Sequence, residues 1–188
     1  FIGGTLFPSN MALAATGNSN FSYKQGEITA KEAKSIGVNM IFAPVLDINN
    51  NPDNPIINFR SYSDSPSTVA KYGTQFIKGI QDGGRIACAK HFPGHGDTKV
   101  DSHLDLPILE NDIFRLEKIE LPPFKALIQQ GINCVMTAHV LFSKVDPNYL
   151  ATFSKKLLVD LLRDKLGFQG VVITDALLMK AITNKYGC

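Results

Sequence analysis

The 188-residue sequence lacks several features that would point to particular classes of protein. It has no apolar run long enough to cross a bilayer, which takes about 20 residues in a helix. Its 19 basic and 17 acidic residues leave a net charge of only +2, and the basic residues are scattered. That distribution offers neither the basic stripe typical of nucleic-acid binding nor a surface suited to anionic lipid. We therefore expect no nucleic-acid partner and no membrane segment.

Cysteine is scarce, and the three cysteines are an odd number. Cys88 and Cys134 lie within apolar runs, which indicates reduced core residues, and Cys188 is terminal and uninformative. No signal peptide is visible, but the chain begins at Phe1 without an initiator methionine. We therefore expect its true beginning to be missing, and the absence of a signal says little about compartment.

One pattern recurs four times: a helix-like segment, a glycine, and then a short apolar strand closed by a polar residue. The four glycines lie 47, 47 and 39 residues apart, a spacing that suits βα units far better than hairpins. The expected strands are nearly continuous apolar runs, as in parallel strands covered on both faces. They span 38–46, 85–89, 132–138 and 171–174.

The segments between these strands carry helix signals. Ser65, followed by a proline, is typical of a helix N-cap with proline in the first turn. Ser154 is likewise expected to cap a helix whose leucines form one apolar stripe. The pair Pro122-Pro123 is expected at or near the start of a third helix. We assign the apolar residues of these helices to core packing.

Four consecutive βα units fit either a doubly wound sheet or part of a (β/α)₈ barrel. A doubly wound sheet would more often show a glycine-rich turn after its first strand, and no G-x-G-x-x-G occurs. A complete barrel typically needs about 250 residues. We therefore predict an α/β fold, a partial TIM-type (β/α)₈ barrel with about four consecutive βα units and units missing from both ends.

Polar residues stand just past the carboxyl end of each expected strand. In either fold, this is the edge of the sheet that faces the ligand site. The convergence of these residues is the strongest functional signal that the residues themselves give. They are Asp47, Lys90, His91, His139 and Asp175.

The segment KHFPGHGDTKVDSH, residues 90–103, leaves three chemistries open. Its glycines permit a phosphate-binding loop but more often mark a tight turn. Its histidines, with His139 and Asp175, could build a hydrolytic metal centre, although no H-x-H occurs at a strand end, where side chains two apart point the same way. Asp101 and His103 could act in acid/base catalysis, with the carboxylate fixing the tautomer of the imidazole.

The acid/base interpretation gains force only beside a nucleophile. Asp175, a carboxylate at the end of an apolar strand, is the candidate. Its alternative role is to be the N-cap of a helix that follows it directly. Position alone leaves both roles open.

Residues 90–103 also closely resemble the signature of bacterial β-N-acetylglucosaminidases of glycoside hydrolase family 3, whose catalytic domain is a TIM-like barrel. Other segments resemble the family in the same order, so the resemblance covers nearly the whole chain. They are FPSNMALAATGN, IFAPVLDIN, FRSYSDSP, VMTAHV and GVVITDALLMKAI. The resemblance implies that residues 1–188 are an incomplete N-terminal catalytic barrel domain that needs no cofactor and no metal.

The resemblance also implies roles for the catalytic candidates. Asp175 would be the nucleophile of a retaining mechanism that passes through a glycosyl-enzyme intermediate. His103, assisted by Asp101, would be the general acid/base in place of the second carboxylate that most glycosidases use.

Three basic residues match sugar-binding positions of the family: Arg60, Lys90 and His91. Their several donors suit hydroxyl and amide oxygens. Without the resemblance, Arg60 would be interpreted as a surface ion pair with Asp64. The remaining candidates are expected to shape the loop (His95 and Asp97) or to line the pocket (Asp47 and His139).

The implied substrate carries a terminal β-linked N-acetylglucosamine, in an oligosaccharide or in a muropeptide from peptidoglycan, with the muropeptide favoured. One alternative is a phosphorylase of the same family, which uses phosphate in place of water. The others are a metal-dependent hydrolase on a TIM barrel and a non-catalytic sugar-binding module. Family members occur in the cytoplasm and outside it, so the compartment stays open, with the cytoplasm favoured over export or the periplasm.

One departure from the family matters for activity. An acidic residue that clasps the sugar's hydroxyls lies, in the family, in a segment before FPSNMALAATGN, and this sequence does not contain that segment. An incomplete barrel would also leave edge strands exposed. We therefore expect the 188-residue piece alone to be unstable or inactive.

Overall fold

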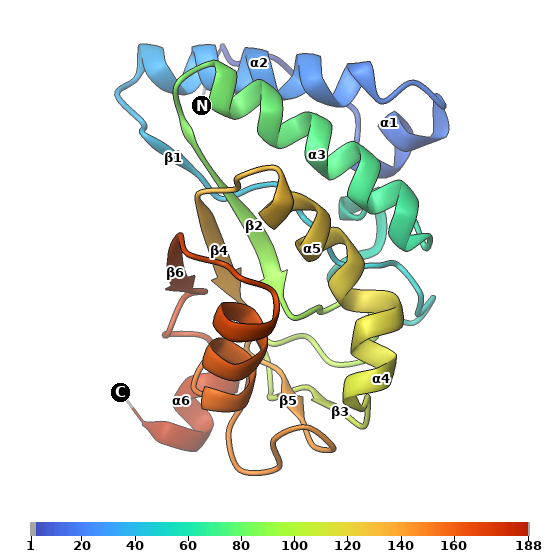
Figure 1. Ribbon diagram of the computed structural model, residues 1–188, viewed down its shortest axis with the longest axis vertical. Helices are drawn as coiled ribbons and strands as arrows, with labels where there is room; N and C mark the ends of the chain where they lie inside the picture. The colour runs from blue at the N-terminus through green and yellow to red at the C-terminus, as the bar shows by residue number, and fades with distance from the viewer. Residues whose placement is uncertain (1–2, 188) are drawn as a thin grey trace.

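The computed structural model describes residues 3–187, which form a parallel β-sheet flanked by helices (Figure 1). The main sheet contains β1 (Met40–Ile41), β2 (Ile86–Phe92), β4 (Cys134–Thr137) and β6 (Val171–Thr174). A second, two-stranded sheet pairs β3 (Ile108–Leu109) with β5 (Leu141–Phe142). The α-helices are α1 (Asn10–Ala15), α2 (Asn20–Ser35), α3 (Pro66–Asp82), α4 (Ile113–Arg115), α5 (Leu121–Gln129) and α6 (Lys180–Tyr186). Three further helical segments are the 3₁₀ turn η1 (Asn58–Arg60) and the π-helical η2 (Leu116–Glu120) and η3 (Lys156–Lys165).

The order of the main sheet is β1-β2-β4-β6, and every pair of neighbours is parallel. Each strand of this sheet therefore lies beside the strand of the same sheet that follows it in the chain, and a helical crossover connects the two. That order is typical of a barrel wall, whereas a doubly wound sheet changes direction at a switch point. The prediction of a partial TIM-type barrel with four βα units is confirmed.

The two faces of the sheet have different packing partners. Ala87, Ala89 and Val135 belong to the large core that the strands share with α3, α5 and η3. Cys88 and Cys134, which are paired in register, face the other side. There they form a smaller cluster, together with Met40, Met136 and Ile173. This alternation follows from the two-residue period of a strand, and it confirms that both cysteines are free and buried.

Both predicted N-caps are present. The Ser65 hydroxyl accepts a hydrogen bond from the Thr68 amide (3.5 Å), and the proline that follows occupies the first turn of α3. The Ser154 hydroxyl accepts from the Leu157 amide (3.2 Å) and donates to Asp146 Oδ2 (2.6 Å). Each cap satisfies a backbone donor that the helix itself cannot pair.

The structure differs from the expected elements at three places. The strand expected over 38–46 is interrupted, because Pro44 has no N–H to donate; β1 ends at Ile41, and the chain rejoins β2 at an isolated bridge between Val45 and Lys90. The pair Pro122-Pro123 lies at the start of α5 as predicted, but α4 and η2 precede it without a break. The β3–β5 sheet was not predicted, because two-residue strands carry no periodic signal.

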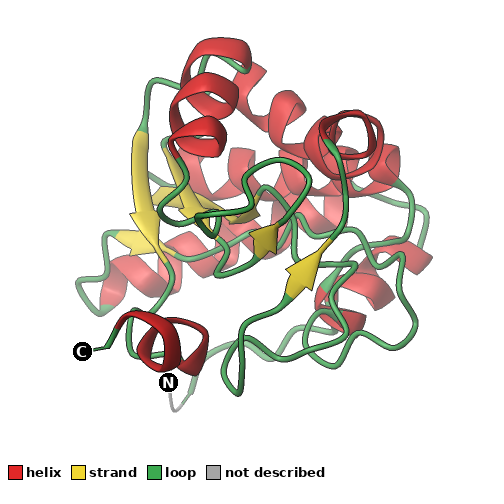
Figure 2. Ribbon diagram, turned by 90° about the horizontal axis from the view of Figure 1, so that it is seen from below, coloured by secondary structure: helices red, strands yellow, loops and turns green. Residues whose placement is uncertain are grey.

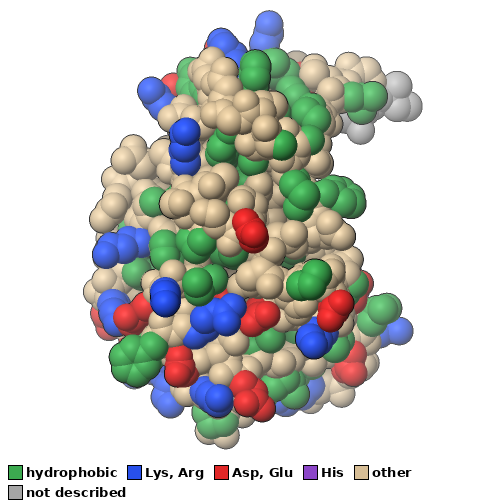
Figure 3. Space-filling view, turned by 90° about the vertical axis from the view of Figure 1, so that its right-hand side faces the viewer, with side chains coloured by type: hydrophobic (Ala, Val, Ile, Leu, Met, Phe, Trp, Pro, Cys, Tyr) green, Lys and Arg blue, Asp and Glu red, His purple; other side chains and the backbone are tan. Residues whose placement is uncertain are grey.

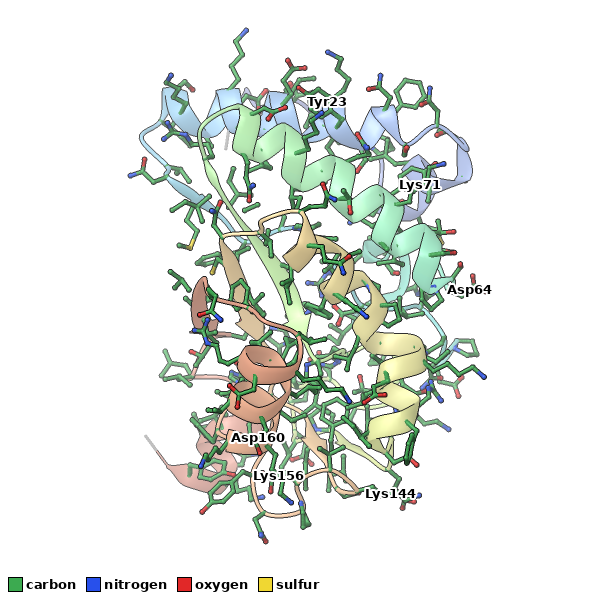
Figure 4. All side chains as sticks on the ribbon, in the orientation of Figure 1. Tyr23, Asp64, Lys71, Lys144, Lys156 and Asp160 are labelled. Carbon is green, nitrogen blue, oxygen red and sulfur yellow. The ribbon has the colours of Figure 1, made fainter. Side chains whose placement is uncertain are left out.

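The helices α2 and α3 lie side by side (Figure 1), and Tyr23 of α2 donates its hydroxyl to Asp82 at the end of α3 (3.1 Å; Figure 4). On the face shown in Figure 3, basic and acidic side chains are interspersed over the lower half. Within residues 3–187, no helix has the length and apolarity that a membrane span requires.

The strands β2 and β4 point toward the lower end of the molecule in Figure 1. Figure 2 looks onto that end and shows loops lying across it, in front of the helices. These loops carry most of the residues that the sequence singled out, so this end of the sheet is where the site has to be sought.

Candidate active site

The carboxylate of Asp47 is the buried centre of the site. It follows the first strand segment and is 1% exposed. Its Oδ2 lies 2.7 Å from His91 Nδ1, and its Oδ1 accepts from the backbone N–H groups of His91 (3.3 Å) and His95 (2.7 Å). Burial alone would raise the pKa of Asp47, but His91 and then His95 outweigh it and hold the pKa below its usual value. Asp47 therefore fixes the strand end and the loop that leaves it.

His91 connects this centre to the candidate nucleophile. Because its Nδ1 faces Asp47, its Nε2 points to the other side, 3.8 Å from Asp175 Oδ2. Asp175 lies at the end of β6, where its Oδ1 accepts from the Ala176 amide (2.7 Å). The structure thus brings together the ends of β2 and β6, as predicted from the strand-end positions.

The helix-cap alternative for Asp175 is wrong. The helix α6 begins only at Lys180, with Met179 at its N-cap position. Asp175 and the four residues after it form a turn instead, and the Asp175 side chain is 30% exposed. A carboxylate that one amide orients and that keeps part of its surface exposed is suited to contact a ligand.

Two cations, Lys90 and Arg60, lie near the candidate nucleophile or its neighbours. Burial, and then the charge of Arg60, lower the pKa of Lys90, while Asp175 and Asp47 partly offset the shift. Arg60 donates from Nη1 to the Ile56 carbonyl (3.1 Å). The alternative role of Arg60, an ion pair with Asp64, is wrong for the described chain, because Asp64 sits at the outer edge of α3 (Figure 4) and accepts from the Ser63 hydroxyl.

Arg60 and Lys90 line a cavity of about 330 Å³, a volume within the usual range for small-ligand pockets. Its other lining includes the aromatic rings of Phe42 and Phe59. Asp175 is not among the described residues that line it. The cavity therefore adjoins the carboxylate but does not enclose it.

The loop after β2 is held by His95. This histidine is 3% exposed, and its two ring nitrogens contact the hydroxyls of Thr98 (2.7 Å) and Ser102 (3.0 Å). Burial, and then the neighbouring His91, lower the pKa of His95 to about 4, so the ring is neutral. The prediction that His95 shapes the loop is confirmed, and so is that for Asp97, whose carboxylate joins the loop to Asn111 and Arg115.

Two glycines of this loop are required by close approach. A Cβ on Gly96 would overlap the backbone of Ile48. Gly94 has a φ of 150°, and a Cβ there would come within 2.8 Å of Glu120. Both positions exclude a side chain because the loop packs directly onto its neighbours.

Asp101 and His103 form the expected pair at the exposed part of the loop. Asp101 Oδ1 accepts from the His103 amide and lies 2.8 Å from His103 Nδ1. Burial would raise the pKa of Asp101, but the His103 amide and ring hold it below its usual value. No hydrogen bond or ion pair among residues 3–187 joins this pair to Asp175. The structure brings the two members of the pair together and leaves them facing solvent.

His139, at the end of β4, is buried behind Asp175. Its Nε2 lies 3.2 Å from the Ala176 carbonyl, which can only accept, so Nε2 carries the hydrogen. Its Nδ1 lies 2.7 Å from the Thr152 hydroxyl, to which Thr137 donates (3.1 Å). Burial lowers the pKa of His139, and the Thr152 hydroxyl beside Nδ1 also donates to the Ala138 carbonyl (3.0 Å). His139 was expected to line the pocket, but it is not among the residues that line the cavity beside Arg60.

The metal alternative requires histidines that converge, and here they do not. His91, His95 and His139 each use their ring nitrogens in separate contacts, with Asp47, with loop hydroxyls and with the Ala176 carbonyl. Among residues 3–187, no three His, Cys, Asp or Glu side chains are placed to share one metal ion. These donors do not form the predicted alternative site.

The sequence reasoning missed several supporting residues. Glu120 is buried beneath Gly94, although it is charged, and Arg115 Nη2 lies 3.2 Å from its Oε1. Its position could have revealed it, because it lies four residues after Leu116 and four before Phe124, on the apolar face of the helix. Thr152, Thr98 and Ser102 gave no such signal, because a single hydroxyl in a loop has no periodic context.

The fold and the site together define a class. The chain is part of a parallel (β/α)₈ barrel. The carboxylate of Asp175 and the buried Asp47–His91 pair lie at its strand ends, and the two cations Arg60 and Lys90 line the neighbouring cavity. In TIM barrels this end of the strands is where enzymes place their catalytic residues. The described residues thus form an enzyme-type barrel segment.

The comparison with known proteins gives the family. Residues 1–188 match the family model described as the glycosyl hydrolase family 3 N terminal domain. The β-hexosaminidase A of Pseudoalteromonas piscicida is 39% identical over 200 residues, which cover 96% of this chain and 33% of that protein. The chain belongs to glycosyl hydrolase family 3.

Solved structures support the same family assignment. A glycoside hydrolase family 3 β-N-acetylglucosaminidase from Paenibacillus sp. str. FPU-7 has a TM-score of 0.96 and 49% identity, covering 98% of this chain and 35% of that one. A β-glucoside phosphorylase, BglX, has a TM-score of 0.91 and 30% identity, covering 96% of this chain and 34% of that one. This chain spans about a third of the length of each of these three relatives.

Proposed function

We propose that the complete protein is a retaining exo-β-N-acetylglucosaminidase, with Asp175 as its nucleophile and His103, assisted by Asp101, as its general acid/base. The observation that carries the proposal is the position of Asp175 at the carboxyl end of a barrel strand, where Oδ1 accepts from the Ala176 amide, Oδ2 lies 3.8 Å from His91 Nε2 and the side chain is 30% exposed. The names of the relatives support the activity, since they are β-hexosaminidases and β-N-acetylglucosaminidases.

The two chemical steps use these residues in turn. In the first, an Asp175 oxygen bonds to the anomeric carbon while the bond to the leaving oxygen breaks, and the His103 imidazolium gives its proton to that oxygen. In the second, water attacks the same carbon, its proton passes to neutral His103, and the Asp175 carboxylate leaves. Two displacements retain the anomeric configuration.

The surrounding residues would bind and orient the sugar. Lys90 and Arg60 supply donors for hydroxyl and amide oxygens beside the cavity. His91 offers Nε2 to a hydroxyl, because Asp47 occupies its other nitrogen. His103 lies on an exposed loop, so the chemistry requires it to approach Asp175 when substrate is bound. We further propose a substrate with terminal N-acetylglucosamine, either a muropeptide or an oligosaccharide.

A family 3 phosphorylase is the second candidate, because the β-glucoside phosphorylase BglX has the same fold over this chain. Phosphate would then replace water in the second step. The two outcomes differ in product, as a sugar phosphate replaces the free sugar.

The test is turnover of an aryl N-acetyl-β-glucosaminide by the complete protein, in phosphate and in a phosphate-free buffer. Asp175→Gly should lose turnover, and azide should restore it with inversion of configuration, because the small anion replaces the missing carboxylate. Lys99→Ala, an exposed change on the same loop, is the matched control and should keep full turnover. Full activity of Asp175→Gly without azide would refute the proposed nucleophile.

A further inference from the structure

We propose that His139 is a positioning residue that fixes the Asp175 carboxylate through the backbone of Ala176. The inference rests on the proposed role of Asp175 as nucleophile. It concerns a histidine that hydrogen-bonds to the backbone beside the carboxylate and that the sequence placed only at the end of a strand.

Ala176 is held from both sides of its backbone. Its N–H donates to Asp175 Oδ1 (2.7 Å), which fixes one carboxylate oxygen. Its carbonyl accepts from His139 Nε2 (3.2 Å) and from the Met179 amide (3.1 Å). An imidazole on the neighbouring strand therefore holds the same residue whose amide orients the carboxylate.

The imidazole is itself rigid. His139 is 1% exposed, and the Thr152 hydroxyl contacts its Nδ1 at 2.7 Å. Thr137 of β4 donates to that hydroxyl (3.1 Å) and is paired in register with Thr174 of β6, the residue before Asp175. The donor that holds Ala176 is thus fixed to the adjacent strand, at the point where the chain leaves the sheet.

The turn after Asp175 is exposed to solvent on its outer side. Leu178 is 81% exposed, and the Asp175 side chain is 30% exposed. A carboxylate at such a place needs a rigid inner attachment if its oxygen is to meet an anomeric carbon at attack distance. Small displacements of a reacting group are costly in rate, because a misplacement of about 1 Å can lower it about 100-fold.

The experiment compares three variants in the complete protein. His139→Leu removes both ring contacts, His139→Gln keeps an N–H donor, and Thr152→Val removes only the hydroxyl that orients the ring. The readouts are kcat and KM for an aryl N-acetyl-β-glucosaminide, with kcat expressed per active site titrated by the first burst of released aryl alcohol. A purely structural role would lower the number of active molecules but leave kcat per site unchanged.

We expect His139→Leu to lower kcat by about 10- to 100-fold with KM nearly unchanged. His139→Gln should recover most of that loss. Thr152→Val should lose about 3- to 10-fold, because the hydroxyl that contacts His139 Nδ1, Thr137 and the Ala138 carbonyl is removed while His139 itself stays. In the double variant His139→Leu with Thr152→Val, the second change should have no further effect. Should His139→Leu fail to fold, the Gln and Thr152→Val variants decide the matter.

Three results would overturn the inference: wild-type kcat in His139→Leu, a Gln variant no better than Leu, or wild-type kcat in Thr152→Val. Failure of the proposed function gives a different result. In that case Asp175→Gly keeps its activity, and azide has no effect, whatever the His139 variants do. Loss of kcat in His139→Leu, together with azide rescue of Asp175→Gly, would support both.

Discussion

The molecule contains two Asp–His pairs with nearly the same geometry and opposite surroundings. Asp47 and His91 are 2.7 Å apart, with side chains 0% and 6% exposed. Asp101 and His103 are 2.8 Å apart, with side chains 23% and 60% exposed. The same chemical pair is locked in the core in one case and faces solvent in the other.

Burial decides what each pair can do. The buried pair has further bonds to the backbone of the loop, so moving either partner would leave a charge or a polar group unpaired. Among residues 3–187, the hydrogen bonds of the Asp101 and His103 side chains are within the pair, so these side chains are freer to move than the buried ones. The comparison suggests that Asp47 holds the site in place and that Asp101–His103 performs proton transfer.

The largest expected effect is on catalysis at the exposed pair. His103→Gln should lower kcat/KM for a substrate with a poor leaving group by about 10²- to 10⁴-fold, because the leaving oxygen then receives no proton. A 2,4-dinitrophenyl substrate should be much less affected in the first step, since its leaving group needs no proton. Lys99→Ala on the same loop is the control. An equal loss with both substrates would contradict the assignment of His103 as general acid.

The next effect is on stability at the buried pair. Asp47→Asn removes the charge that His91 and the loop amides face, and should lower the free energy of unfolding by about 3–5 kcal/mol. Urea unfolding of the complete protein measures it, with Asp53→Asn, an exposed aspartate nearby in sequence, as the control. A loss below about 1 kcal/mol would show that the pair is not the fixed centre that its burial indicates.

Sequence patterns sufficed for what depends on periodicity and on strand ends. The glycine-strand repeat gave the four strands and their parallel order, and the hydroxyls of Ser65 and Ser154 gave two helix starts. The convergence of Asp47, His91 and Asp175 followed from the position of each after a strand. These features are set by local residues and by a general rule of parallel sheets.

The rest depended on contacts between segments far apart in the chain. That His91 binds Asp47, and that His139 holds the backbone after Asp175, are pairings across 44 and 37 residues with no local signature. The exposure of His103 could not be predicted either, because a D-x-H sequence occurs in both buried and solvent-exposed segments. Family resemblance assigned chemical roles, but it could not show which pair is buried.

Glu120 offers a pH-dependent way to probe the buried region. Burial raises its pKa to about 7, despite the opposing charge of Arg115. A carboxyl with a raised pKa in the folded state stabilises the fold fully below its unfolded pKa and loses that contribution as pH rises through the folded value. Stability should therefore fall between about pH 4.5 and pH 7, by an amount on the order of 3 kcal/mol.

The measurement is the difference in unfolding free energy between the wild type and Glu120→Gln, taken at several pH values. The glutamine does not titrate, so the difference in unfolding free energy should move in its favour as pH rises from about 4.5 to about 7 and should level off above that. A difference that stays constant with pH would mean that the pKa of Glu120 is the same in the folded and the unfolded protein, which would contradict the prediction.

The smallest effect on the free energy of unfolding is expected at the exposed pair, and it distinguishes the exposed pair from the buried pair most clearly. Asp101→Asn should change the free energy of unfolding by less than about 1 kcal/mol at pH 7, because a solvated pair contributes little. The pKa of Asp101 is lowered in the fold, so its small contribution is present above the unfolded pKa and disappears as pH falls through the folded value. Turnover by the same variant should nevertheless fall, since His103 loses the carboxylate that orients it. A variant with normal turnover and a large loss of stability would reverse the roles of the two pairs.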